Sequence, residues 1–314
     1  MKPISNGKKN HTVLAKAKHI IFTRANVTLY LMFLPVFIYF IIFSYIPMLG
    51  ISIAFMDFRA SGFRGWMGLA NFKYIFSLPF FWRALRNTID FTALNYLLAF
   101  PAPIILALLL NELRLKIFKK FVQTVSIMPH FISWVVVSGV FISMLSPTVG
   151  YINQFIKLFG GTPIYFLSKS AWFQTIVSLI RVWKGIGYNT IIYLAALSGV
   201  DQELYDAAVI DGAGRWKQTI HITLTGIRPV ILVVLVLSFT GVLNLFDPVY
   251  VFLNDIVLSK GEVLDTYIYK SGVVQGKYPI STAVGLFKSM ISLVLVLIIN
   301  QVGKKLSEDN VSVI

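Results

Sequence analysis

The sequence predicts an all-α integral membrane protein, and three features lead to that prediction. Hydrophobic residues make up 57% of the 314 residues and charged residues only 13%, whereas soluble domains carry about 25% charged residues. The mean hydropathy is +0.76. The apolar residues are also gathered into long runs, and a helix needs roughly 20 such residues to cross the hydrocarbon core of a bilayer.

Six of these apolar runs are long enough to span a bilayer, so we predict a single bundle of six transmembrane helices. Pro and Gly occur within some of the runs, and membrane helices tolerate them because neighbouring groups satisfy the freed backbone. We detect no internal repeat and no soluble domain. The predicted spans cover residues 27–54, 86–110, 121–145, 172–198, 229–253 and 279–302.

The basic residues predict the orientation of these spans. With the N-terminus inside, the inner segments carry more Lys and Arg than the outer ones, and such an excess is typical of cytoplasmic segments. This explains the net charge of +15 without nucleic acid, since the basic N-terminal stretch lacks interleaved aromatic residues. We expect both termini in the cytoplasm. The chain then divides into a basic segment 1–26, a transmembrane domain 27–302 with an inner loop at 199–228, and a tail 303–314.

The inner loop is more than a plain connector in its sequence. Asp201 is a good helix N-cap, and Gly212 suits the position after a helix end. The residues between them predict a short helix over 202–211, about 15 Å long. Ala207 and Ala208 are small, so another surface can approach this helix closely. The alternative is a surface helix that does no more than link two spans.

Several residues of the loop recur at the spacing of a known motif. They are Asp206, Ala207, Ala208, Gly212, Ile222 and Leu224. In this spacing the loop resembles the "EAA…G…I-LP" loop of the permease subunits of binding-protein-dependent ABC importers. Asp206 replaces the usual Glu, and Thr225 stands where the motif has Pro. These two departures leave the rest of the spacing intact.

The resemblance extends over about residues 28–305, to the carbohydrate branch of these permeases with its MalF-like and LplB-type oligosaccharide permeases. The residues that carry it are FPAPIILALLLNEL (100–113), PHFISWVVVSGV (129–140), WKGIGYNTIIYLAAL (183–197) and DTYIYKSG…STAVGLFKS (265–289). It implies a six-helix ABC importer permease bundle with a cytoplasmic coupling helix, in the bacterial cytoplasmic (inner) membrane. The substrate it implies is an oligosaccharide delivered by an extracytoplasmic binding protein.

The resemblance also implies partners. A second permease subunit would share the sugar cavity, and the coupling helix would dock on a separate ATPase dimer. The chain has no GxxxxGK[ST] phosphate loop, so ATP and Mg would be bound by that ATPase, and this chain would be no enzyme and hold no cofactor. The predicted coupling residues are Glu203, Leu204, Tyr205, Asp206, Ala207, Ala208, Asp211, Gly212, Ala213 and Trp216.

Polar side chains within the predicted spans are costly and usually face a cavity or a partner. Near span ends, snorkelling to the interface is the alternative. The polar groups within the predicted spans are Asp90, Asn95, Arg181, Lys184, Asn189, Asn244, Asp247, Lys288 and Asn300.

The predicted substrate pathway takes four of these polar residues and two aromatic ones that could stack on sugar rings, although packing is the alternative for aromatics. If the sugar is acidic, Lys184 is the first candidate for pairing with its charge. We predict no metal site, since Cys is absent and the four His have no ligand spacing. The predicted pathway residues are Trp183, Lys184, Tyr188, Asn189, Asn244 and Asp247.

Two other classes of protein remain as alternatives. An ion-coupled secondary carrier for a small solute would predict internal repeats and midplane carboxylates, of which the sequence shows no repeat and few carboxylates. A membrane-embedded enzyme would need paired carboxylates, a metal cluster or a nucleophile with its base. The sequence favours the permease over both.

Overall fold

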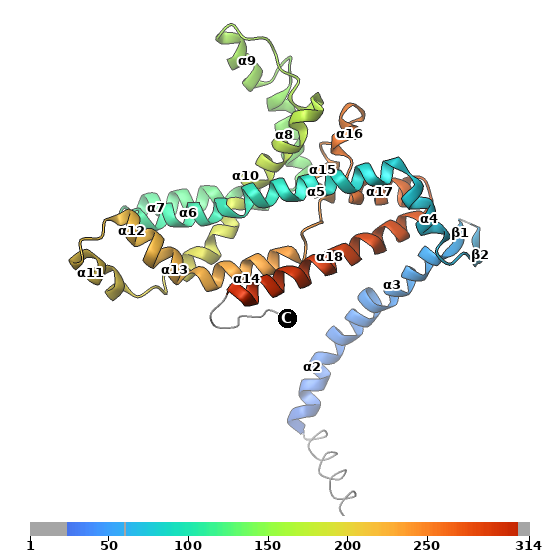
Figure 1. Ribbon diagram of the computed structural model, residues 1–314, viewed down its shortest axis with the longest axis horizontal. Coiled ribbons are helices and arrows are strands. Elements are labelled where there is room, and N and C mark those ends of the chain that lie inside the picture. Colours follow the sequence, from blue (N-terminus) through green and yellow to red (C-terminus); the bar gives the residue numbers. More distant parts are fainter. Residues whose placement is uncertain (1–23, 60, 307–314) are drawn as a thin grey trace, which may run out of the picture. The chain divides into compact units, whose positions relative to one another are not determined.

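The computed structural model describes residues 24–59 and 61–306, and Figure 1 shows them as coloured ribbons. Most of the predicted N-terminal segment 1–26 and of the predicted tail 303–314 therefore lies outside the described residues. The chain falls into two compact units, Met1–Ile53 and Ala54–Ile314. Each unit is described by itself.

The first unit is an apolar helical segment. It contains α2 Arg24–Phe40, a π-helical turn and α3 Ile46–Met48. The stretch Val27–Phe55, which ends two residues beyond the unit, is long and apolar enough to cross a membrane. No residue in its most apolar part is buried. The first predicted span, 27–54, is thus helical, and its side chains are exposed over residues 27–49, whereas Ala54 at its end is buried.

The second unit holds the remaining elements, of which α10 Ser170–Leu197 and α18 Tyr278–Leu306 are the longest. α14 and α18 lie side by side, and α11 to α13 lie at the opposite end of the unit from α4 (Figure 1). The other helices are α4 Ala70–Ser77, α5 Pro79–Ala99, α6 Pro101–Glu112, α7 Lys116–Ile127, α8 Trp134–Leu145, α9 Tyr151–Leu158, α11 Gln202–Ile210, α12 Arg215–Gln218, α13 Leu224–Gly226, α14 Arg228–Phe239, α15 Phe246–Tyr250, α16 Leu258–Gly261 and α17 Leu264–Tyr269.

One hairpin departs from the all-helical prediction. β1 Met56–Arg59 pairs antiparallel with β2 Gly62–Trp66. Gly62 and Gly65 have φ angles of 105° and 156°, which residues other than glycine rarely adopt. The hairpin therefore depends on glycines, and it lies between the first two predicted spans.

The predicted count of six spans is not confirmed by length and hydropathy. In the described residues, three helices are long and apolar enough to cross a membrane, or up to five if each bent pair of helices is one span. α10 covers the fourth predicted span, 172–198, but is not among them. It carries Arg181, Lys184 and Asn189, which lower its hydropathy.

Two predicted spans are broken where the sequence analysis expected one helix. The span 121–145 bends by 105° between Phe131 and Trp134, because Pro129 lies in the intervening turn and the Ser133 side chain starts a new helix by accepting from the Val136 N–H. The span 229–253 ends as a helix at Phe239. α14 instead forms a pair, bent by 58°, with the helical segment before it.

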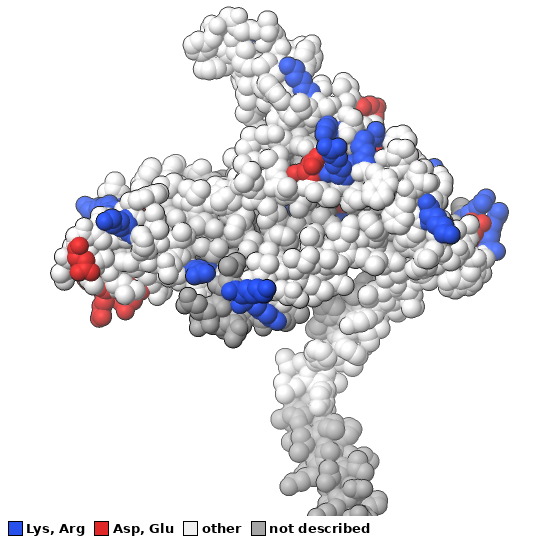
Figure 2. Space-filling view, viewed as in Figure 1, with Lys and Arg blue, Asp and Glu red and all other residues white. Residues whose placement is uncertain are grey.

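The core of the second unit lies around α10, which packs against α5, α6 and α7. Phe91 of α5 and Phe173 of α10 meet edge to face at 6.2 Å within the largest buried cluster. Gly187 lets α10 approach the end of α7, since a Cβ there would lie 2.1 Å from the Ser126 carbonyl oxygen. The surface is largely free of charge, with acidic side chains gathered near α11 (Figure 2).

Candidate functional site

The predicted helix in the inner loop is present as α11, and its two ends are built as the sequence predicted. The Asp201 carboxylate accepts the Glu203 N–H at 3.0 Å. At the other end, Ala213 N–H donates to the Ala208 carbonyl at 2.8 Å, while Gly212 has a φ of 72°. This bond, with one from Gly212 N–H to the second-last helical carbonyl, makes a Schellman motif that satisfies the last carbonyls of the helix.

Two contacts hold the loop in place. The Tyr205 hydroxyl is hydrogen-bonded to Thr223 Oγ1 at 2.9 Å, which joins α11 to the helical segment that returns towards α14. Arg215 of α12 lies 3.4 Å from the carboxylate of Glu112 at the end of α6. These two contacts connect the loop to α6 and to the helical segment before α14.

The loop exposes several large apolar side chains beside its acidic ones. Leu204, Ile210 and Trp216 are 53%, 86% and 76% exposed, and the neighbouring Val209 is 63% exposed. Val209 and Ile210 were not among the predicted coupling residues, although both are large apolar residues within the loop. Of the predicted residues, Tyr205, Ala208 and Ala213 are half-buried, and the exposed ones are Glu203, Leu204, Asp206, Ala207, Asp211, Gly212 and Trp216.

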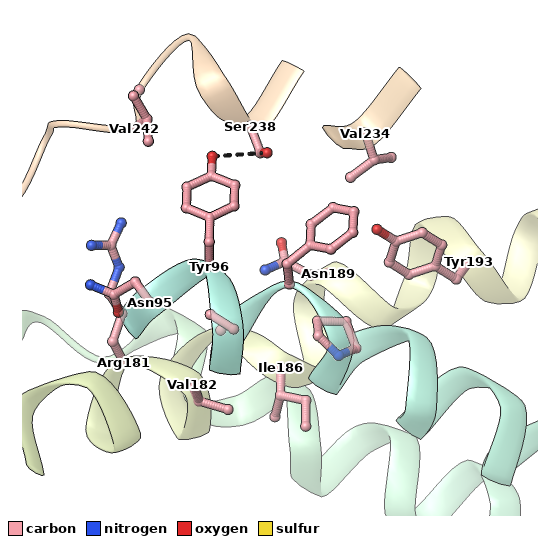
Figure 3. A pocket seen from close by; sticks show the side chains of 15 residues that line it. Asn95, Tyr96, Arg181, Val182, Ile186, Asn189, Tyr193, Val234, Ser238 and Val242 are labelled. Atoms are coloured by element: carbon pink, nitrogen blue, oxygen red, sulfur yellow. Dashed lines mark hydrogen bonds between the residues drawn. The ribbon is translucent and has the colours of Figure 1, made fainter. Parts of the chain in front are cut away.

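A second site lies among α5, α6, α10 and α14, as a cavity of about 240 Å³ (Figure 3). The Tyr96 hydroxyl of α5 donates to Ser238 Oγ of α14 at 3.0 Å across it. Its α10 wall presents one stripe at four-residue spacing, which is the repeat of a helix face. That stripe consists of Arg181, Gly185, Asn189 and Tyr193.

Of the predicted pathway residues, the structure brings only Asn189 to this pocket. Lys184 and Tyr188 lie on the adjacent stripe of α10 and contact His130. The Lys184 ammonium donates to the His130 carbonyl at 2.7 Å, and the Tyr188 ring stacks on the His130 ring at 4.0 Å between centroids. Trp183 packs edge to face against a phenylalanine of α8. These three residues therefore hold α10 against the bend between α7 and α8.

The other two predicted pathway residues follow the end of α14. Asn244 accepts a hydrogen bond from the Lys288 ammonium at 3.1 Å. Asp247 is exposed in the first turn of α15. The sequence analysis missed Tyr96, Tyr193 and Ser238. Of these, only Tyr193 could have been indicated by the sequence, through its spacing of four residues from Asn189 on α10.

No group of three or more His, Asp or Glu side chains is placed to hold a metal ion within residues 24–59 and 61–306. The polar groups of the pocket are amides, hydroxyls and one guanidinium. Such groups suit hydrogen bonding to a polar solute.

Membrane-spanning helices around a polar pocket, with an exposed capped loop at one end, define a membrane transport permease. Residues 99–308 match the family "Binding-protein-dependent transport system inner membrane component", and the chain belongs to it. It is a permease subunit of an ABC importer, a transport subunit rather than an enzyme, and the ion-coupled carrier is not supported. The resemblance found in the sequence is thus confirmed.

Similar proteins cover nearly the whole chain. The polygalacturonan/rhamnogalacturonan transport system permease protein YteP of Bacillus subtilis (strain 168) is 47% identical, over 90% of this chain and 89% of its own. Protein LplB of the same organism is 44% identical, over 90% of each. A solved bacterial alginate ABC transporter in complex with alginate pentasaccharide-bound periplasmic protein matches at a TM-score of 0.86 and 36% identity, over 91% of this chain and 96% of its own.

Proposed function

We propose that this chain, with a second permease, forms the membrane part of an ATP-driven importer for oligosaccharides that an extracytoplasmic binding protein delivers. Two of the similar proteins are described with the saccharide polymers polygalacturonan/rhamnogalacturonan and alginate, and one of these with a sugar-bound periplasmic protein. The pocket supports the proposal, because hydroxyls and amides from three helices suit the many hydroxyl groups of a sugar.

The observation that carries the proposal is the exposed face of α11. Both ends of this short helix are capped by bonds within the loop, which holds its shape when another protein binds it. Its apolar side chains Leu204 and Ile210 are exposed beside small Ala207, which suits insertion into a groove on another protein. The chain itself has no phosphate loop for ATP. We assign α11 the role of docking on an ATPase dimer, which binds the ATP and Mg.

This role also sets the orientation. The ATPase is cytoplasmic, so α11 and the inner loop lie on the cytoplasmic side, and with the six spans predicted from the sequence both termini would lie there too. The remaining wall of the sugar pathway belongs to the second permease. The predicted pathway residues Asn244 and Asp247 keep that role as part of this proposal where the second chain completes the cavity.

The test is Ala207→Trp in the assembled importer. A bulky ring on the exposed side of α11 should block the close approach, so the ATPase should no longer co-purify or its hydrolysis should no longer respond to sugar-loaded binding protein. Ala171→Trp is the matched control, since Ala171 is an exposed alanine in the first turn of α10, the end away from α11. Normal attachment and normal stimulation in Ala207→Trp would refute the docking role.

A further inference from the structure

The pocket contains a cation, Arg181, that no residue of the described part of the chain neutralises. Arg181 lies eleven residues after Ser170, the first residue of α10, which is roughly 16 Å along the helix at about 1.5 Å per residue. It is therefore far from both ends of a 28-residue helix. Its guanidinium contributes to the lining of the cavity (Figure 3).

Arg181 makes no ion pair or hydrogen bond with any described residue. Its Nη1 is buried and has no hydrogen-bond partner there. Other cations inside the second unit behave differently: Lys288 pairs with Asp265, and Arg83 lies 3.6 Å from Glu262. Burying a charge without a partner is costly. A bound anion would offset that cost by pairing with the guanidinium.

The pocket itself supplies no such anion. No Asp or Glu is among the residues that line it. Beside Arg181, in Figure 3, lies Asn95, which is 7% exposed, donates its amide to the Phe91 carbonyl and leaves a buried Oδ1 without a donor. The site thus holds an unused cationic donor next to an unused acceptor.

These two groups define the chemistry of a ligand. A guanidinium presents its donors as a planar fork that matches a carboxylate with two parallel hydrogen bonds. The Asn95 carbonyl oxygen suits a hydroxyl group next to that carboxylate. A sugar acid offers both groups on one ring, whereas a neutral sugar leaves the guanidinium unpaired.

We propose that Arg181 is the carboxylate-binding residue of the pocket, and that the importer selects oligosaccharides containing uronic acids. This inference rests on the proposed oligosaccharide import and adds the substrate class. It also moves the charge-pairing role from Lys184, whose ammonium is engaged by the His130 carbonyl, to a residue three positions earlier.

The experiment measures binding to the purified, assembled transporter without its binding protein, so that the selectivity of that protein does not enter. The probes are tri-galacturonate and its fully methyl-esterified form, which differ only at the carboxyl groups, where the ester loses the negative charge and gains a methyl group. In the wild type, the acid should bind about tenfold or more tightly than the ester, as expected for a hydrogen bond to a charged group.

Three variants separate charge recognition from a structural role. Arg181→Gln should remove the preference for the acid while the ester binds as before, and Arg181→Lys should keep part of it. Lys184→Gln is the matched control and should keep the full preference. Without sugar, Arg181→Gln should be at least as heat-stable as the wild type, because the removed cation has no partner among the described residues.

Equal binding of acid and ester by the wild type would overturn the inference. So would an equal loss of both in Arg181→Gln, or a lowered stability of that variant without sugar, which would mean that the second permease supplies the counterion. ATP-driven uptake of neutral oligosaccharides alone would leave the proposed function standing and refute the uronic acid. Failure to transport any oligosaccharide would refute the proposed function as well.

Discussion

The inner loop and the pocket are built in opposite ways. The ends of α11 are held by bonds between residues two to five positions apart, such as Asp201 with Glu203 and Ala208 with Ala213. The pocket is closed by Tyr96 and Ser238, which are 142 positions apart. A site made of local bonds can be read from the sequence, whereas one made of distant contacts depends on how the helices pack.

This contrast has a consequence for stability. The loop should tolerate changes to helix packing, while the pocket should be sensitive to residues that never touch it. The turn after α14, next to the pocket residue Val242, shows why. Asp265 of α17 accepts the Leu245 N–H at 2.8 Å and pairs with Lys288 of α18, which also donates to Asn244. One ion pair therefore fixes the end of the α14 wall.

The largest effect is expected at this pair. The Lys288 and Asp265 side chains are 14% and 11% exposed, and breaking a buried pair from one side typically costs about 3–5 kcal/mol. Asp265→Asn keeps an acceptor for the Leu245 N–H but leaves Lys288 without its counterion. We expect a large loss of thermal stability of the purified complex, and loss of sugar uptake.

The double variant Asp265→Asn with Lys288→Met is the control for this prediction. It removes both charges, so most of the lost stability should return. If the double variant were as unstable as Asp265→Asn, the pair would not be what fixes the turn, and the dependence of the pocket on distant charges would be wrong.

An intermediate effect is expected where α10 meets α7. A side chain at Gly187 would overlap the Ser126 backbone, whereas one at Gly185, two residues earlier, would meet only the Asn189 amide at 3.6 Å. Gly187→Ala should therefore push the helices apart and cost about 1–3 kcal/mol. Thermal unfolding of the purified protein measures it.

Gly185→Ala is the matched control for that change. It lies in the same helix, where Ala is favoured over Gly by about 0.5–1 kcal/mol, so it should be neutral or slightly stabilising. Equal stability of the two variants would show that α10 can shift without penalty, and that the packing around the pocket is looser than the contact at Ser126 implies.

The smallest effect on stability is expected in the inner loop. Gly212 has a φ of 72°, and no atom lies within 4 Å of a Cβ built there, so Gly212→Ser should cost about 1–2 kcal/mol through backbone strain alone. Gly214 has a φ of −68° and caps α12, where Ser is favoured. Gly214→Ser should be neutral.

The two loop variants are compared by ATPase co-purification and by sugar-stimulated hydrolysis. Because the exposed end of α11 can open locally and relieve the strain, Gly212→Ser should weaken coupling while the melting temperature of the whole protein hardly changes. A large drop in melting temperature would mean that the loop contributes to the stability of the helix bundle. The proposed contrast in stability between the loop and the pocket would then be wrong.

The sequence determined the membrane class, the family and the capped helix in the inner loop. Composition decides whether a chain partitions into lipid, and Asp201 and Gly212 mark helix ends through bonds to their own neighbours. The sequence also named Asn95, Arg181 and Asn189 as polar groups within spans. These residues could be identified from the sequence because a polar residue is conspicuous within an apolar run.

What only the tertiary structure decided is which polar groups meet. Lys184 and Arg181 lie three residues apart on α10, yet the first contacts the His130 carbonyl and the second lines the pocket. The sequence analysis likewise predicted continuous helices over 121–145 and 229–253, although the first is bent after Pro129 and the second ends as a helix at Phe239. A helical run fixes the spacing of its side chains, but the neighbours that each one meets come from helices far along the chain, and their packing determines which charges are paired and which remain available for a substrate.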